Sequence, residues 1–548
     1  PIFFAILQLV RFLSDPLNMM KIILTLILLC FMNTISSQNP FFETYSTLHS
    51  TVPFDKIKTG DYVPAIREGI RRQNAEIEAI IRNPEVPTFA NTVLAYEKSG
   101  EMLHRVSTVF GNLLSAETDD DLQELAKEIM PMMSEHENNI SLNEELFARI
   151  KAVYEQQDKE TLSPEQHKLL EDIYNGFVRN GANLLGEDKE KYRALCKELS
   201  LLTLQFSENN LKETNDYKLV ITDKSQLAGL PESAVEAAAE TAGEKGVEGW
   251  VFTLQAPSYG PFLTYADSRD LRRELYMAYN TKCTHDNASN NLEIVKKLAN
   301  VRMEIAQLLG YDNFAEYNLQ ERMAQNSESV YKLLDQLLEA YTPTAKQEYA
   351  EVQALARQAE GEDFVLMPWD WAYYSHKLKD RKFNIDDELL RPYFELNNVK
   401  QGVFGLATRL YGITFKKNPD IPVYHKDVDA YEVFDKDGKF LAVFYTDFHP
   451  RAGKRSGAWM TSYKEQWIDE KTGENSRPHI SIVMNFTKPT QDKPALLTFG
   501  EVETFLHEFG HSLHGMFANS TYGSLSGTNV YWDFVELPSQ FMENFAIE

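Results

Sequence analysis

The stretch 504-TFLHEFGHSLHG-515 decides how the rest of this sequence is interpreted. Its apolar residues recur at helical spacing around the polar ones, which predicts a helix. On that helix His507 and His511 are four residues apart, so their imidazoles project from the same face, within reach of one ion. Glu508 lies beside this face, where a carboxylate can take a proton from an activated water molecule. The spacing therefore predicts a metal site with a general base next to it.

An ordinary amphipathic helix is the alternative interpretation, because a bare His-Glu-x-x-His pattern also arises by chance. Two features argue against it. Gly510 lowers the helix propensity but permits the close approach of another element. In addition, histidine and glutamate side chains in such an apolar surround need partners.

A catalytic zinc ion needs a third protein ligand and one open position for water. The candidate is Glu536, at the start of ELPSQFMENF. Pro538 is tolerated only in the first turn of a helix, so a second helix is expected to begin at Glu536. A capping box of Asp533 and Glu536 is the alternative. His514 shares the face of His511 and is expected to be structural or to line the site, since a fourth protein ligand would close the open position.

Composition and charge narrow the class of protein. The 548 residues, 43% hydrophobic and 12% aromatic, can bury a large core in two or more domains. The 55 basic and 81 acidic residues give a formal charge of −26, which argues against nucleic acid as a partner. The cysteines, Cys30, Cys196 and Cys283, are too few and too widely spaced for a disulfide framework or a cysteine zinc site.

The amino-terminal segment is typical of a secretory signal. From Met20 the sequence reads MKIILTLILLCFMNTISSQNP, with one lysine, a short apolar run and then small polar residues. The run is too short to span a bilayer comfortably, which favours a signal peptide near Met20–Ser37 over a buried first helix. We expect residues 1–37 to be upstream residues and signal peptide, with no stable membrane span after its removal. The expected location is extracytoplasmic, in a bacterial periplasm.

Most of the remaining chain has helical periodicity. In residues 62–82, for example, Ile66, Ile70, Ile77 and Ile81 form one apolar stripe among charged residues. The Ala-, Gly- and Pro-rich stretch 223–263 is interpreted as a break that ends in a short extended run. The expected regions are therefore a helical region, 38–261, and a catalytic region, 262–548.

Between about residues 421 and 486 the apolar period changes to two. AYEVFD and KFLAVFYTDF flank KDG, which predicts a hairpin, and HISIVMNF predicts a further strand. The sequence thus predicts a mainly α protein with a small sheet beside the helix that bears the histidines.

At these residues the chain resembles a known family. FLHEFGHSLHG, followed by YGSLSGTNVYWDFVELPSQFMENF, is similar to the zinc site of the thimet oligopeptidase and neurolysin family of zinc peptidases. It is most like the bacterial peptidyl-dipeptidase (dipeptidyl carboxypeptidase) branch. PTFANTVLAYEKSG, PWDWAYYSHKL and RAGKRSGAWM extend the resemblance, which covers essentially everything from about residue 39 onward. It implies a two-lobed helical body with a deep channel that admits short unstructured peptides.

Carried onto this sequence, the resemblance makes His507, His511 and Glu536 the ligands of one zinc ion and Glu508 the general base and acid. It implies a zinc metallopeptidase that releases C-terminal dipeptides. Three alternatives remain: an internally cleaving oligopeptidase of the same family, a carboxypeptidase that releases single residues, and a peptide-binding protein without catalysis. The intact Glu508 argues against the last.

Further expectations concern the surroundings of the site. The small sheet would line the channel and pair with the substrate backbone, and GAWM (457–460) and SGTNV (526–530) would border the bound substrate. Glu503 and Glu543 are candidates to orient the imidazoles. The family continues past Glu548 with tyrosine and histidine residues that stabilise the tetrahedral intermediate. We therefore expect a carboxy-truncated copy that keeps its metal ligands and general base.

Overall fold

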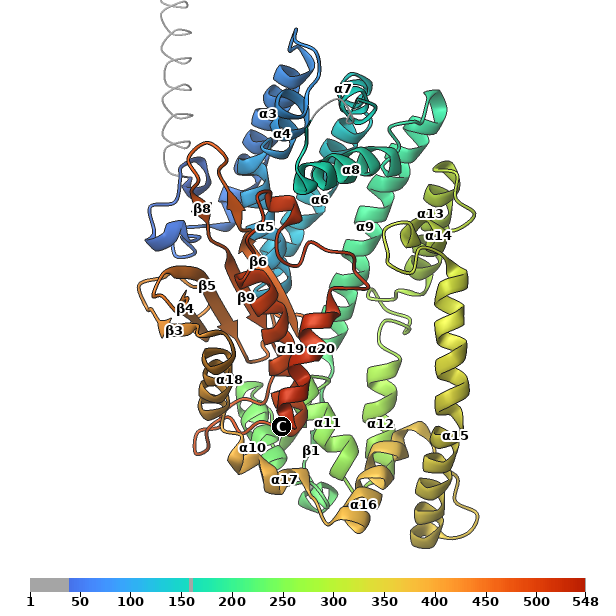
Figure 1. Cartoon of the computed structure of the whole chain (residues 1–548). Coiled ribbons are helices and arrows are strands. Elements are labelled where there is room, and N and C mark those ends of the chain that lie inside the picture. The colour runs from blue at the N-terminus through green and yellow to red at the C-terminus, as the bar shows by residue number, and fades with distance from the viewer. Residues whose placement is uncertain (1–38, 157–160, 548) are drawn as a thin grey trace, which may run out of the picture.

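The computed structural model describes residues 39–156 and 161–547, so the predicted signal segment lies outside the described residues. Within them the chain is mostly helical with a small sheet, as the sequence predicts (Figure 1). Among the described helices, not one is both long and apolar enough to cross a bilayer.

Amphipathic helices form the amino-terminal part of the structure. They are α3 (Tyr62–Ile81), α4 (Leu94–Glu97), α5 (Glu101–Ala116), α6 (Asp120–Ser141), α7 (Glu144–Tyr154), α8 (Pro164–Arg179) and α9 (Gly186–Asp216). The apolar stripe predicted for α3 is confirmed. Ile66 and Ile77 are buried, and Ile70 and Ile81 pack at the margins of two core clusters.

The Ala-rich part of the predicted break is a helix, which corrects the sequence-based interpretation. Helix α10 spans Glu232–Glu244, where consecutive alanines supply the highest helix propensity of any residue. An extended run is present, since β2 (Trp250–Phe252) pairs antiparallel with β1 (Leu219–Ile221), but the stretch does not end in it, because a further helix begins at Ala256. Counting alanine with glycine and proline as a sign of a loop caused the error.

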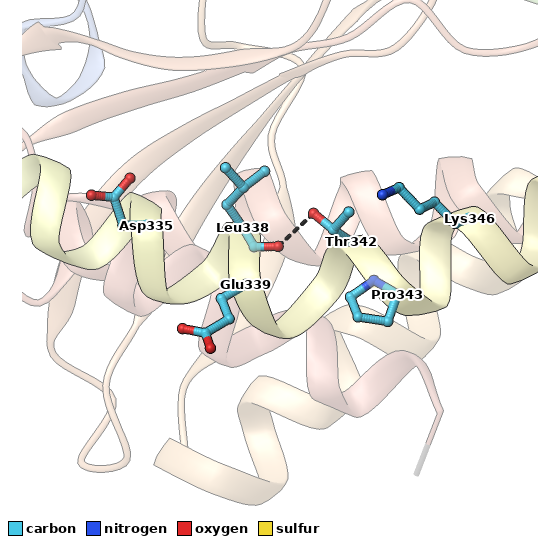
Figure 2. A pocket seen from close by; sticks show the side chains of 6 residues that line it. All are labelled: Asp335, Leu338, Glu339, Thr342, Pro343 and Lys346. Atoms are coloured by element: carbon cyan, nitrogen blue, oxygen red, sulfur yellow. Dashed lines mark hydrogen bonds between the residues drawn. The ribbon is translucent and has the colours of Figure 1, made fainter.

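A second series of helices leads to the sheet. It comprises α11 (Ala256–Tyr265), α12 (Arg269–Asn280), α13 (Leu292–Leu308), α14 (Phe314–Leu319), α15 (Ser327–Glu360), α16 (Trp371–Phe383), α17 (Asp387–Leu390) and α18 (Leu396–Tyr411). Helix α15 runs unbroken through Pro343. Figure 2 shows a shallow hollow on this helix, lined by residues such as Leu338 and Pro343. None of the predicted site residues lines it.

The main sheet has five strands in the order β3-β4-β5-β9-β6, antiparallel except for the parallel pair β5 and β9. Its strands are β3 (Thr414–Lys417), β4 (Val428–Phe434), β5 (Phe440–Asp447), β6 (Trp459–Lys464) and β9 (His479–Val483). A separate two-stranded sheet pairs β7 (Trp467–Ile468) with β8 (Asn475–Ser476). The predicted hairpin is β4 and β5, and the further strand is β9. The sheet begins at β3, earlier than the predicted residue 421. Strand β3 was not predicted because it is mostly exposed and lacks an apolar alternation.

Helix α19 (Phe499–Met516) bears the histidines and packs on strands β6 and β9 of this sheet (Figure 1). Phe505 and Phe509 are fully buried against sheet residues that include Phe444. Thr498 begins the helix through a capping box with Glu501. The sheet therefore fixes the orientation of the helix that carries the site.

A buried charge cluster joins the sheet to the amino-terminal helices. Asp447, at the end of β5, is fully buried and accepts hydrogen bonds from Arg451 and from the fully buried ammonium group of Lys454. Arg451 also donates to the Ala116 carbonyl at the end of α5 and to the Glu117 carboxylate. Pairing and hydrogen bonding make the burial of these charges tolerable. The cluster thereby holds α5 against the end of β5.

Candidate metal centre

Close contact between two helices creates the candidate site. Helix α20 (Glu536–Glu543) begins at Glu536, as Pro538 predicts, and packs against α19 at Gly510. A Cβ atom at Gly510 would lie 2.5 Å from the Pro538 oxygen and 2.6 Å from the Ser539 Cα. These distances are too short for any side chain. The glycine therefore lets the first turn of α20 reach the face of α19 that bears the histidines.

We expect Gly510→Ala to destabilise the protein by about 1–3 kcal/mol, because the added methyl group collides with backbone atoms of α20. Urea unfolding would measure this loss. Gly500→Ala in the same helix is the matched control, since its Cβ would have only the Thr498 hydroxyl oxygen nearby, at 4.0 Å. Alanine also has the higher helix propensity. Equal stabilities of the two variants would contradict the packing argument.

The two imidazoles and one carboxylate converge on a single point. Nε2 of His507 and Nε2 of His511 lie 3.2 and 3.1 Å from the same oxygen of Glu536, Oε2. One ligand atom from each residue lies within 4.8 Å of the others. Two ligands of a tetrahedral ion with bonds of about 2.0–2.1 Å are separated by about 3.3 Å. Nitrogen, nitrogen and oxygen donors at this spacing fit a divalent metal ion.

Glu543 orients the first imidazole. Its Oε1 lies 2.6 Å from Nδ1 of His507, so the other ring nitrogen, Nε2, is the one that faces Glu536. Such a contact fixes the tautomer of a metal-ligating histidine. The alternative candidate, Glu503, is exposed and contacts neither imidazole within the described part of the chain. Of the two acids that the sequence offered for this role, only Glu543 takes it.

Glu543→Ala is expected to lower the metal affinity by about 10–100-fold, because His507 loses the group that holds its ring. Competition with a chromophoric chelator would measure the affinity. The exposed Glu503→Ala variant serves as the control and should match the unmodified protein. A metal affinity unchanged in Glu543→Ala would show that the ring is positioned without this carboxylate.

Ser539 supports the third candidate ligand, Glu536, and its role was not predicted from the sequence. Its hydroxyl group is buried and donates to Oε2 of Glu536 at 2.7 Å. Burial opposes ionisation of Glu536, but this hydrogen bond and the nearby imidazole of His511 bring its pKa below the ordinary value. The carboxylate is therefore held in the charged form that a metal ligand requires. The spacing in the sequence could have indicated this contact, because a serine three residues after Glu536 lies within the same helical turn.

Glu508 lies next to the cluster and is 5% exposed. Among the described residues its Oε2 atom has no hydrogen-bond partner. Burial raises the pKa of Glu508 to about 7, while His507 acts to lower it and Glu536 to raise it. A carboxylate with a pKa near neutrality suits proton transfer in both directions.

His514 and Asp533 do not take part in the converging ligand group. His514 lies outside the group of converging ligand atoms, and its buried Nδ1 has no hydrogen-bond partner among the described residues. The capping box of Asp533 and Glu536 is wrong, because no side chain caps α20 and Asp533 accepts hydrogen bonds from the Met323 and Ala324 backbones instead.

The two segments expected to border the substrate both approach α19 at Gly515, one through Met460 and the other through Gly527. Residues 457–460 lead into the edge strand β6, and residues 526–530 belong to the connection between α19 and α20. Met460 packs close to Gly515 of α19. Contact of either segment with a substrate stays a prediction.

Comparisons with known proteins show which family the chain is similar to. Residues 262–548 match Peptidase family M3. The chain is 41% identical over 515 residues to dipeptidyl carboxypeptidase of Escherichia coli strain K12, covering 93% of this chain and 75% of that protein. It is 35% identical over 501 residues to oligopeptidase A of the same organism, covering 90% and 73%. A solved structure of PZ peptidase A with an inhibitor matches with a TM-score of 0.49 and 15% identity, over 90% of this chain and 70% of that one.

Proposed function

The chain belongs to peptidase family M3 and is a metallopeptidase, and from this premise we propose that it uses one zinc ion to release dipeptides from the carboxyl ends of short peptides. The observation that carries the proposal is the convergence of Nε2 of His507 and Nε2 of His511 on one oxygen of Glu536. Two histidines and a glutamate are a ligand set of catalytic zinc sites that keep one position open. The 41% identity to a dipeptidyl carboxypeptidase supports the dipeptide product.

The chain's own residues perform the proton transfers. When bound, the ion supplies Lewis-acid polarisation of the scissile carbonyl group and acidifies water. Glu508 accepts a proton from the attacking water and then delivers it to the leaving amine, for which its pKa of about 7 is suited. Glu543 keeps the ring of His507 in place throughout.

The sheet offers a surface for an extended peptide. Strand β6 is an edge strand, and it adjoins α19. A peptide can add to such an edge through backbone hydrogen bonds. At Ser462 the carbonyl group already accepts a hydrogen bond from Asn112 of α5. We therefore infer that a substrate would pair with the Trp459–Thr461 part of the strand.

A location outside the cytoplasm is part of the same proposal. It is supported by the pattern of residues 20–37 in the sequence. Short unstructured peptides are the proposed substrates there.

Incubation with a pentapeptide that has a free carboxyl end, and with its C-terminal amide, tests the function directly. Mass spectrometry of the products should show dipeptides from the free acid only, and a chelator should stop the reaction. Cleavage within the amide peptide would favour an internally cleaving oligopeptidase, as the 35% identity to oligopeptidase A allows. Release of single residues would contradict the dipeptidase assignment, and hydrolysis that resists the chelator would contradict the zinc assignment.

A further inference from the structure

The connection between α19 and α20, residues 517–535, is fastened to distant parts of the chain. Near its start, the Thr521 backbone donates to Glu165 of α8 at 3.1 Å. Further along, the Ser524 backbone donates to Glu97 of α4 at 3.1 Å. The last attachment, through Asp533, stands three residues before Glu536. Of these three attachments of the connection, it is the one nearest to the start of α20.

Asp533 binds the loop of residues 320–326, which precedes α15. One carboxylate oxygen accepts the N–H of Met323 at 2.9 Å, and the other accepts the N–H of Ala324 at 3.0 Å. Hydrogen bonds to a charged acceptor are stronger than those between neutral groups. The guanidinium of Arg322 also lies over the Trp532 ring, 5.3 Å from its centroid. Two neighbouring residues thus bind the same loop.

The loop of residues 320–326 follows α14, and Arg179 of α8 contacts both the loop and that helix. Arg179, the last residue of α8, donates to the Tyr317 carbonyl at 2.8 Å and pairs with Glu321 at 3.0 Å. Its guanidinium also lies 4.3 Å from the centroid of the Tyr317 ring. The loop that Asp533 binds is thus tied to α8 through Glu321, and the helix before it is tied to α8 through Tyr317.

Glu536 has few direct constraints of its own. Half of its side chain is exposed, and no side chain caps the helix that it begins. Its one hydrogen bond from a non-histidine side chain comes from Ser539 in the same turn, at least among the described residues. The position of its carboxylate relative to His507 and His511 thus depends on where the first turn of α20 is placed.

We propose that Asp533 is a positioning residue for the metal centre, which sets the first turn of α20, and with it Glu536, by binding the loop of residues 320–326. The inference rests on the proposed metal site. It predicts that loss of the Asp533 contact loosens the third ligand while the two histidines on α19 keep their places.

The metal-induced rise in melting temperature measures this effect without relying on activity. For Asp533→Ala we expect a smaller rise on addition of zinc and a zinc affinity about tenfold lower. Its kcat should fall with little change in KM. Asp533→Asn keeps one acceptor oxygen and should be intermediate. The control is Asp335→Ala, an exposed residue of α15 with no hydrogen bond or ion pair in the described structure, and it should match the unmodified protein.

The outcomes separate the two proposals. If zinc does not raise the melting temperature of the unmodified protein, the proposed metal site fails. If it does, but Asp533→Ala gives the same rise, the positioning role is wrong. A lower melting temperature without metal and an unchanged rise with metal would mean a merely structural role and also overturn the inference. Should Asp533→Ala fail to fold, the nearly isosteric Asp533→Asn decides.

Discussion

Glu508→Gln is expected to lower kcat/KM by about 10²–10⁴-fold and to leave the metal affinity unchanged. The amide keeps the size of the carboxylate but cannot accept the proton of the attacking water. Because Glu508 is buried and its Oε2 has no hydrogen-bond partner among the described residues, no neighbouring group stands in for it. Steady-state kinetics on a chromogenic peptide would measure the loss.

Glu503→Gln, in the same helix but exposed, is the matched control for this substitution. It should retain the full rate. If Glu508→Gln kept more than a tenth of the rate with its metal bound, another group would have to be the general base.

His511→Ala is expected to abolish metal retention and, with it, activity. Glu536 and His507 each supply one ligand atom, so neither can replace the lost imidazole nitrogen of His511. Dividing the about 10–16 kcal/mol of a four-ligand zinc site among its ligands gives roughly 3 kcal/mol for one of them, or more than a hundredfold in affinity. Zinc content after gel filtration would measure this.

His514→Ala tests whether the effect is specific to the ligand. The residue lies one turn further along α19 but outside the converging group, so the variant should bind zinc like the unmodified protein. A loss of zinc in His514→Ala as large as in His511→Ala would show that the proposed ligand set is wrong.

The sequence predicted those parts of the site that depend on local rules. Histidines four residues apart share a helix face, and Pro538 predicts that a helix begins at Glu536. Both expectations agree with the structure. The hairpin of β4 and β5 followed in the same way from the turn residues between two apolar runs.

Other features could not be predicted because they depend on contacts between distant residues. Glu503 and Glu543 were equally good candidates until the crossing of α19 and α20 placed only Glu543 beside His507. Likewise Asp533 finds its donors in Met323 and Ala324, about two hundred residues earlier in the chain. Residue spacing contains no information about such pairs.

The buried charges at the end of β5 bear on which part of the chain can be made alone. Although the family match starts at residue 262, Arg451 depends on Ala116 and Glu117, which precede it by more than three hundred residues. A fragment of residues 262–548 would expose Val443 and Tyr445 of β5, which share a core cluster with amino-terminal residues such as Phe110, and would leave this guanidinium without two of its partners. Such a fragment should be insoluble by itself and become soluble on co-expression with residues 39–261, since residues of both pieces share one core cluster.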